Sequence, residues 1–415
     1  MNYIFSTGLS RSGTALLTKM LYESNQASLA VGPNIETYRF FRNKLISKYG
    51  SAKLKKKVKK FSPIPDYFGS EEGIELLNLM LNSNLNEKFD KKDWKIYLKK
   101  SISRNDHDSA DLLQYFTKLK GNTFKDIILN LLNIIKKKRK IRKNNKRNKN
   151  IYYGFNETWN ICSLKALATA FPKAKFYVVI RDPRSVFASL SKNSDNLKNY
   201  KYKNYKKNEE IHVHLLSLCR HFRKYIILSN YYLSLPLFKN RIMVVKYEDL
   251  KTNPKICLKK ICKFLKIEFN NNMINPNKYY DFVTKKKWIP HSAFSTKFPK
   301  QDNKPIHQWK KYLSDIEVKS IELLCENEMS SMGYKFKFRK NEKNFDKVIQ
   351  FIKKNYNKKV NWRTDLMDFK KDRYIEHVRY KILNNKIKVN NKLMQKCFLF
   401  NNHSLSSLIK HYKEQ

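Results

Sequence analysis

A turn near the start of the chain has the residue types and spacing of an anion-binding loop. Residues 8–15, GLSRSGTA, repeat the G-x-x-x-x-G spacing of a phosphate-binding loop, but Thr14 and Ala15 stand where Lys and Ser or Thr would follow. That lysine contacts the β- and γ-phosphates and the hydroxyl ligates Mg²⁺, so their loss argues against a metal-bound triphosphate. The backbone N–H groups and the positive end of the next helix still attract an anion, and Arg11 adds a charge. The loop therefore predicts metal-free binding of a phosphate or sulfate group.

A second anion pocket is predicted where a buried run of residues ends. Residues 171–190, FPKAKFYVVIRDPRSVFASL, place Arg181 at the carboxyl end of a strand and Ser189 on the following helix. Ligands of open α/β sheets bind at the carboxyl ends of the strands, which puts a guanidinium and a hydroxyl beside the first loop. Two phosphate pockets on one sheet favour a ligand with phosphate at both ends, such as a 3′,5′-bisphosphorylated adenosine.

Three apolar runs supply the strands that would position these residues. Residues 2–8, 175–181 and 241–246 have the near-continuous apolar pattern of buried strands. Helices are expected from Gly13, from Asp182-Pro183 and from Pro254, because each start carries a turn, cap or first-turn signal. Strands that alternate with helices indicate an α/β fold with a parallel sheet.

Further helices are expected outside this alternating core. Residues 211–235 form a long apolar-rich helix, and residues 314–332 open with the capping box SDIE and stop at Gly333. A Lys-rich, mostly helical insertion spans 40–150, and its segment 136–150 is either a polyanion-binding face or a solvated loop. Residues 335–415 are basic and helical, without a readable motif.

Composition limits the class of protein. Lys and Arg number 87 against 35 Asp and Glu, a formal net charge of +52, which fits either polyanionic partners or a compositional bias toward lysine. The six cysteines are scattered without metal-ligand spacing, which favours reduced thiols and a cytoplasmic setting. No signal peptide is visible, and the apolar run 126–135 is shorter than a bilayer span. A soluble protein is expected.

Four segments together resemble the sulfotransferases that use 3′-phosphoadenosine-5′-phosphosulfate (PAPS). They follow the order and spacing of that family: LSRSGTALL (9–17), FPKAKFYVVIRDPRSVFAS (171–189), VVKYEDLKTNPKICLKKICKFLKI (244–267) and HQWKKYLSDIEVKSIELLCENEMSSMGY (307–334). The resemblance implies a P-loop-like three-layer sandwich with a central parallel sheet. A sulfotransferase domain would span 1–334, with the insertion at 40–150, and a helical extension of unassigned role would span 335–415.

The resemblance also implies roles for individual residues. The 5′-phosphosulfate would be bound by Arg11, Ser12, Gly13, Thr14 and Ala15. Arg181 and Ser189 would bind the 3′-phosphate, while Tyr247 and Ser292 would close over the nucleotide. PAPS would be the donor and adenosine 3′,5′-bisphosphate (PAP) the product, with no metal required. Arg11 stands where soluble small-molecule sulfotransferases carry Lys, and in this it resembles the carbohydrate- and protein-modifying branches.

Sulfuryl transfer to a hydroxyl also needs a base for the acceptor proton, and two carboxylates compete for that role. The resemblance implies Glu36 as the base, with Arg39 as a contact to the substrate or to the base. Glu157 lies before the helix that leads into FPKAKF and is the other candidate. Many relatives carry Lys near this point, where this chain has Asn156. Arg11 and Lys165 therefore both remain candidates for the cation at the oxygen that bridges the sulfuryl group and the 5′-phosphate.

Other functions fit the sequence less well. A P-loop kinase would need the missing lysine and an acidic residue where Arg181 stands. A nucleic-acid-binding protein would fit the net charge, but no motif of such proteins is present. The expected acceptor is a carbohydrate or glycolipid hydroxyl, or an amine, ahead of a protein or a small molecule. Contact with anionic surfaces fits the charge, whereas sequence-specific binding of nucleic acid is not expected.

Overall fold

The computed structural model of the 415-residue chain describes most of the sequence in eleven stretches. They are residues 2–31, 35–58, 65–102, 121–138, 150–157, 160–197, 214–275, 279, 287, 304–356 and 367–414.

The centre of the protein is a five-stranded, fully parallel sheet of order β2-β3-β1-β4-β5. Its strands are β1 (Asn2–Gly8), β2 (Ala27–Val31), β3 (Tyr152–Asn156), β4 (Lys175–Ile180) and β5 (Ile242–Lys246). The three strands predicted from apolar runs are confirmed, each ending within one residue of its expected bounds. Strands β2 and β3 were not predicted. The register pairs Ser6 with both Asn156 and Tyr177, so β1 lies at the centre of the sheet.

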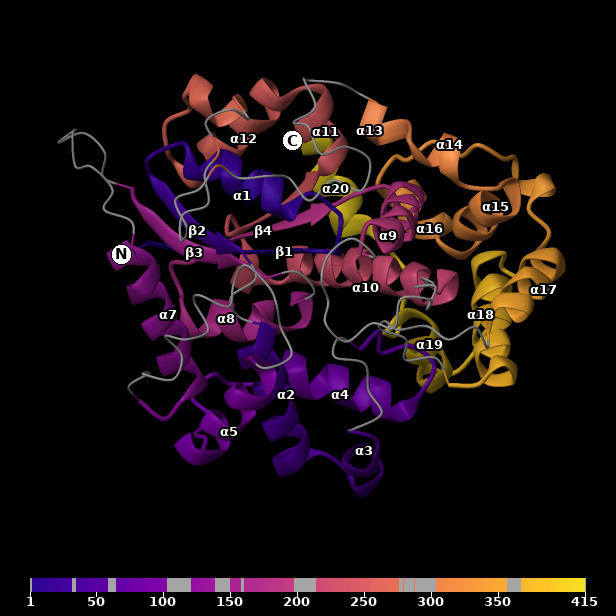
Figure 1. Ribbon diagram of the computed structural model, residues 1–415. Helices are drawn as coiled ribbons and strands as arrows, with labels where there is room; N and C mark the ends of the chain where they lie inside the picture. The colour runs from indigo at the N-terminus through magenta and orange to yellow at the C-terminus, as the bar shows by residue number, and fades with distance from the viewer. Residues whose placement is uncertain are drawn as a thin grey trace.

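Helices cover both faces of the sheet and make a three-layer α/β arrangement (Figure 1). One face packs against α1 (Thr14–Tyr22), α11 (Tyr247–Thr252), α12 (Pro254–Leu265) and the short turn η3 (Asn271–Ile274) through a core that includes Leu17, Val179 and Leu258. The other face packs against α2 (Ile35–Tyr49), α4 (Glu71–Leu81), α7 (Phe124–Lys138), α8 (Leu164–Ala170) and α10 (Leu215–Ser234). Helices α9 (Pro183–Leu197), α3 (Ala52–Lys57) and α5 (Lys91–Ile102) and the turns η1 (Ile161–Ser163) and η2 (Pro236–Phe238) complete this part.

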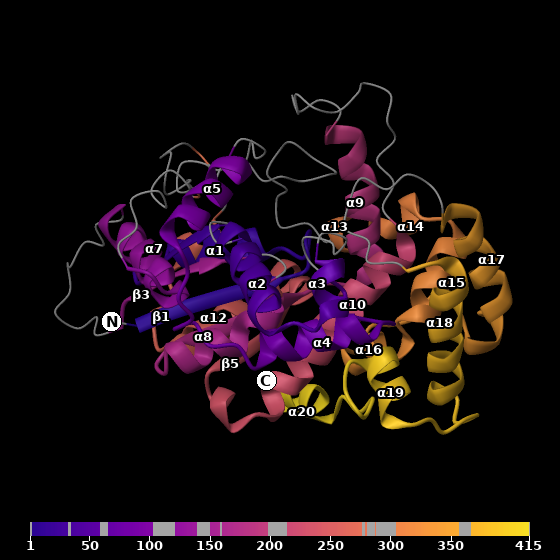
Figure 2. The same cartoon turned by 90° about the horizontal axis from the view of Figure 1, so that it is seen from below.

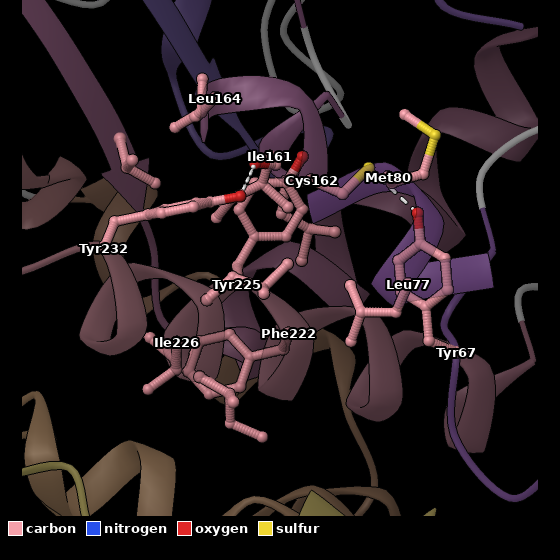
Figure 3. Packing of buried hydrophobic residues seen from close by; sticks show 14 of the residues in the cluster. Tyr67, Leu77, Met80, Ile161, Cys162, Leu164, Phe222, Tyr225, Ile226 and Tyr232 are labelled. Atoms are coloured by element: carbon pink, nitrogen blue, oxygen red, sulfur yellow. Dashed lines mark hydrogen bonds between the residues drawn. The ribbon is translucent and has the colours of Figure 1, made fainter. Parts of the chain in front are cut away.

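The larger core lies between α10 and the helices of the insertion. Figure 3 shows its centre, where Tyr232 on α10 donates a hydrogen bond of 2.7 Å to the carbonyl of Ile161, and Tyr67 donates one of 3.0 Å to Cys162 Sγ. The described part of residues 40–150 is mostly helical. Most of the basic segment 136–150 lies outside the described residues. None of the helices described combines the length and the apolar character needed to cross a bilayer.

The region predicted as one helix over 314–332 is two helices. The capping box is present at Ser314 and Glu317, but the chain breaks at Cys325 between α15 (Asp315–Leu324) and α16 (Glu326–Ser331). The end at Gly333, which has φ +67°, is confirmed. Two single-turn helices, α13 (Lys304–His307) and α14 (Trp309–Tyr312), precede this pair.

Figure 2 shows three C-terminal helices at the end of the molecule opposite α5 and α7. They are α17 (Phe345–Tyr356), preceded by the turn η5 (Lys340–Glu342), α18 (Phe369–Leu383) and α19 (Asn391–Phe398). Helix α20 (Ser406–Glu414) lies apart from them, nearer the middle of this view. Residues of α17, including Val348, belong to the same apolar core as α10. Helix α18 meets α10 through buried ion pairs. Glu376 accepts hydrogen bonds from Arg220 Nε at 3.0 Å and from Arg223 Nη1 and Nη2 at 2.6 and 2.8 Å.

Helix α20 covers the outer edge of β5. The backbone N–H of Val244 donates to His411 Nε2 at 3.2 Å, and the Tyr412 hydroxyl lies 3.4 Å from the Val244 carbonyl oxygen and donates to it. Val244 is the middle residue of β5. Side chains of the last helix therefore take the hydrogen-bonding groups at the centre of this edge.

Candidate active site

The loop between β1 and α1 has a backbone that suits close approach of an anion. Arg11 and Gly13 both have positive φ, 66° and 89°. A Cβ atom on Gly13 would lie 2.2 Å from Cδ2 of Tyr247, so only glycine fits beneath this ring. The N–H and hydroxyl of Ser12 both turn back to the carbonyl of Leu9, at 3.0 and 2.5 Å, and fix the bend. The helix α1 begins at Thr14 and directs its N-terminus at this loop.

The two predicted anion pockets are parts of one cluster. Arg11 Nε donates to the hydroxyl of Ser189 at 3.0 Å, and Arg181 Nη1 donates to the backbone carbonyl of Arg11 at 2.8 Å. The guanidinium of Arg181 also lies over the ring of Tyr247, 4.3 Å from its centroid. Residues from the ends of β1, β4 and β5 and from α9 thus meet at one edge of the sheet. This edge is the carboxyl end of all strands, where open α/β sheets bind their ligands.

This cluster concentrates positive charge. Burial, followed by the adjacent charge of Arg181, lowers the pKa of Arg11 to about 10. Two guanidinium groups that repel each other in a partly dry site gain stability when an anion binds between them. The electrostatics of the site therefore favour a phosphate or a sulfate group.

Two carboxylates that follow β4 and β5, Asp182 and Glu248, hold the backbone of this region in place. Glu248 accepts a bond of 3.0 Å from the backbone N–H of Asp182 and one of 3.1 Å from the Tyr334 hydroxyl. Burial, then the charge of Asp182, raises the pKa of Glu248. Arg184 bonds Asp182 at 2.6 Å and Glu322 at 2.5 Å. Glu322 and Tyr334, from the part of the chain after residue 304, therefore fix Arg184 and Glu248 beside the site.

A comparison with family models shows to which protein family the chain belongs. The model described as "Sulfotransferase family" matches residues 3–271, well over half of the chain. The chain belongs to the sulfotransferase family. The resemblance noted in the sequence is therefore confirmed, and the chain is a sulfotransferase enzyme. Its place among the branches of the family stays a prediction.

Solved structures similar to this sulfotransferase include two domains from biosynthetic enzymes. One is the sulfotransferase domain from the Synechococcus PCC 7002 olefin synthase, at 15% identity and a TM-score of 0.45, with 81% of this chain and 96% of that domain covered. The other is the sulfotransferase domain from the curacin biosynthetic pathway, at 14% identity and a TM-score of 0.44, with 81% and 98% covered. The search of curated proteins found no match.

Both carboxylates predicted as the base of this sulfotransferase lie at the carboxyl edge of the sheet. Glu157 directly follows β3, is 3% exposed, and donates its backbone N–H to the carbonyl of Ser6 at 2.9 Å. Glu36 is the second residue of α2, which follows the neighbouring strand β2. The side chain of Glu36 lies outside the described residues. The structure therefore leaves both as candidates by position.

The remaining predicted residues of the sulfotransferase are spread more widely. Arg39 lies in the second turn of α2, close in sequence to Glu36. Lys165 lies on α8, and its Nζ donates to Asn82 at the end of α4 at 3.3 Å, whereas Arg11 lies within the cationic cluster. Ala15 is the second residue of α1. Ser292 lies outside the described residues.

Sequence reasoning missed two supporting residues of the sulfotransferase, Glu248 and Glu322. Glu248 follows Tyr247 within the family-like segment 244–267, and this position beside Tyr247 was a signal that could have found it. Glu322 reaches Arg184 across 138 residues of sequence, and no spacing pattern could indicate that pair. Among the residues described, no three His, Cys, Asp or Glu side chains gather in a way that could hold a metal ion.

Proposed function

We propose that this enzyme transfers a sulfuryl group from PAPS to a hydroxyl group of an acceptor. The observation that carries the proposal is the contact of Arg11 with Ser189 and of Arg181 with the Arg11 carbonyl, at 3.0 and 2.8 Å. These contacts support the proposal because they bring the two predicted phosphate-binding elements within the span of one adenosine bisphosphate. The family match supports the reaction class.

The donor's two charged ends would be held by different parts of the cluster. The backbone N–H groups of residues 13–15 and the Arg11 side chain would face the 5′-phosphosulfate, while Arg181 and Ser189 would hold the 3′-phosphate. Ser12, which the sequence also assigned to the 5′-phosphosulfate, gives both its N–H and its hydroxyl to the carbonyl of Leu9 and shapes the loop instead. Tyr247, whose ring stacks on Arg181, would cover the nucleotide. In this arrangement the guanidinium groups and the backbone N–H groups balance the negative charge of the donor. Binding of the donor therefore does not depend on Mg²⁺.

The transfer step needs a base and a stabilised leaving group. Arg11 stabilises the negative charge that develops as the S–O bond to the 5′-phosphate breaks. A carboxylate, Glu36 or Glu157, accepts the proton of the attacking hydroxyl. The acceptor favoured by the sequence is a carbohydrate or glycolipid hydroxyl, or an amine. All six cysteines are buried and free of disulfides, which supports a reducing, cytoplasmic setting.

Binding of PAP without a metal tests this function. Thermal unfolding followed with and without PAP in EDTA should show a rise in Tm of several degrees at about 100 times the Kd, because a ligand of the native state adds roughly 2.7 kcal/mol there. ATP with Mg²⁺ is the control for a kinase. Stabilisation by ATP and Mg²⁺ with none by PAP would contradict the proposal.

The choice of base can be decided with two conservative variants. Glu36→Gln and Glu157→Gln each keep shape and remove the proton acceptor, and loss of a general base costs about 10²-fold or more in kcat. The variant of the true base should lose transfer of ³⁵S-labelled sulfate to the acceptor while keeping the Tm shift with PAP. If both variants keep full kcat, neither carboxylate is the base.

A further inference from the structure

The outward side of α12 carries positive charge and no negative charge. The apolar side of this helix packs on the sheet together with α1, and Figure 1 shows both helices in one outer layer. No acidic residue occurs between Asp249 and Glu268. The exposed residues of the helix, together with the exposed residue that directly follows it, form what we call the α12 face: Lys255, Ile256, Lys259, Lys260, Lys263 and Lys266.

The charge of the α12 face has no local counter-charge. Within the described stretches, none of its five lysines forms an ion pair. Exposed lysines on other helices do have such partners, since Lys371 lies 2.9 Å from Asp368 and Lys410 lies 3.8 Å from Glu414. Lys255 also stands in the first turn of α12, where the helix dipole disfavours a cation. The stability of the helix therefore does not account for this lysine.

Lys175 reports the same excess of positive charge at the end of α12. Its Nζ lies 4.6 Å from the centroid of the Phe264 ring and donates to the carbonyl of Asn240 at 2.5 Å. Burial, followed by the charges of Lys266 and Arg241, lowers the pKa of Lys175. Both of these charges are positive, so an anionic surface that approaches this end of the helix is attracted.

One apolar side chain stands out from the solvent side of the helix among the lysines. Ile256 is 59% exposed, more than any other large apolar side chain in the part of the chain that the structure describes. It lies one turn before Lys259 and Lys260. Lysines that surround an exposed aliphatic group suit the boundary of a lipid bilayer, where the cations contact the headgroups and the aliphatic group enters between them.

We propose that the α12 face docks this enzyme on a membrane that contains anionic lipid. Clusters of about four to eight lysines or arginines bind such membranes by charge, and the α12 face has five lysines. Helix α12 follows α11 from the carboxyl end of β5, and its Phe264 meets Lys175 at the amino end of β4. The first turn, with Ile256, therefore lies toward the sheet edge that carries the nucleotide cluster.

A single-stranded nucleic acid is the other polyanion that five lysines would attract. Proteins that bind such strands add aromatic side chains on which the bases stack. The α12 face has an isoleucine and no aromatic residue among its exposed members. The apolar group of this face therefore favours lipid over nucleic acid.

The charge of the face is tested by sedimentation with vesicles of phosphatidylcholine, with and without phosphatidylserine. Wild type should bind only the vesicles that contain phosphatidylserine, and less at high salt, because salt screens exposed charges. Lys259→Gln/Lys260→Gln should weaken binding about 30-fold, since each lysine contributes about fivefold. The matched control is Lys353→Gln/Lys354→Gln, an adjacent exposed pair on α17, which removes the same charge and should leave binding unchanged.

The apolar contact is tested with Ile256→Ala. This variant should bind the same vesicles about fivefold more weakly, because less apolar surface enters the bilayer, and should bind polyuridylate as wild type does. Ile96→Ala is the control, because Ile96 on α5 is 55% exposed and lies outside the α12 face. It should bind the vesicles as wild type does.

Three results would overturn the inference. They are failure of wild type to bind phosphatidylserine vesicles, equal weakening by the two lysine pairs, and unchanged vesicle binding by Ile256→Ala. If the variant of Lys259 and Lys260 also lost polyuridylate binding in the third case, the face would belong to a nucleic acid. All variants should keep the wild-type Tm and its rise with PAP. Absence of the PAP effect in wild type would count against the proposed donor and leave membrane docking intact.

Discussion

Arg11→Ala is expected to weaken PAP binding and to reduce sulfuryl transfer by about 10³-fold. In the proposed function Arg11 gives charge-assisted hydrogen bonds to the donor, and losing two such bonds costs about 4 kcal/mol, or about three decades in rate. Isothermal titration with PAP and labelled transfer measure the two effects. Arg11→Lys keeps a positive charge but loses the Nε bond to Ser189, so it should fall between wild type and Arg11→Ala.

Arg11→Ala should weaken PAP binding without lowering the stability of the ligand-free protein. Burial and Arg181 lower the pKa of Arg11, so the ligand-free protein carries an uncompensated charge. Removing it should leave the Tm of the ligand-free protein unchanged or higher, although PAP no longer raises the Tm. Arg373→Ala, at an exposed position on α18, is the control and should change neither value. A lower Tm in Arg11→Ala together with an intact PAP effect would show that Arg11 has only a structural role.

Glu376→Ala is expected to lower the free energy of unfolding by about 3–5 kcal/mol, because removing one partner of a buried ion pair strands the remaining charges. Burial alone would raise the pKa of Glu376, but Arg223 and Arg220 hold it at about 2, so the carboxylate is ionised in the folded protein. Both arginines are fully buried on α10 and would lose this partner together. Urea denaturation gives the free energy of unfolding.

A surface glutamate provides the matched control for Glu376. Glu414 on α20 pairs with Lys410 at 3.8 Å, and its side chain is 64% exposed. Glu414→Ala should therefore change the free energy of unfolding by less than about 0.5 kcal/mol. Glu376 bonds Arg220 and Arg223 on α10 rather than Arg11 or Arg181, so the affinity of folded Glu376→Ala for PAP should equal that of wild type. Equal stability of the two variants would mean that the buried pairs do not hold α18 to α10.

The elements of the fold that depend on short, local sequence patterns could be predicted. Apolar runs fixed β1, β4 and β5, and their neighbouring turn and Asp-Pro signals fixed α1 and α9. The carboxyl ends of parallel strands share one edge, so Arg11 and Arg181 could be expected to meet before their contact was known. Their direct link through the Arg11 carbonyl is a finding of the structure.

What could not be predicted depends on contacts between distant segments. Strand β3, YYGFN, carries Gly154 and a terminal Asn156, which weaken its strand pattern. Gly154 is required there because a Cβ atom would lie 1.6 Å from the Ile4 carbonyl oxygen of β1. Strand β2, ASLAV, holds small residues at Ala27, Ser28 and Ala30, which give a weaker strand pattern than that of β5 at the same length. Likewise, the ion pairs of α10 with α18 join residues about 150 positions apart, and no periodic pattern reports such a pair.

The contact of α20 with β5 limits how copies of this enzyme assemble. An open strand at the rim of a sheet recruits a strand from a neighbouring molecule, which leads to continuous sheets across subunits, exchange of segments, or fibres. Here His411 and Tyr412 already occupy the polar groups of Val244, so no foreign strand can pair there while this helix is docked. Oligomers of the folded enzyme are then not expected to form by adding a strand at β5.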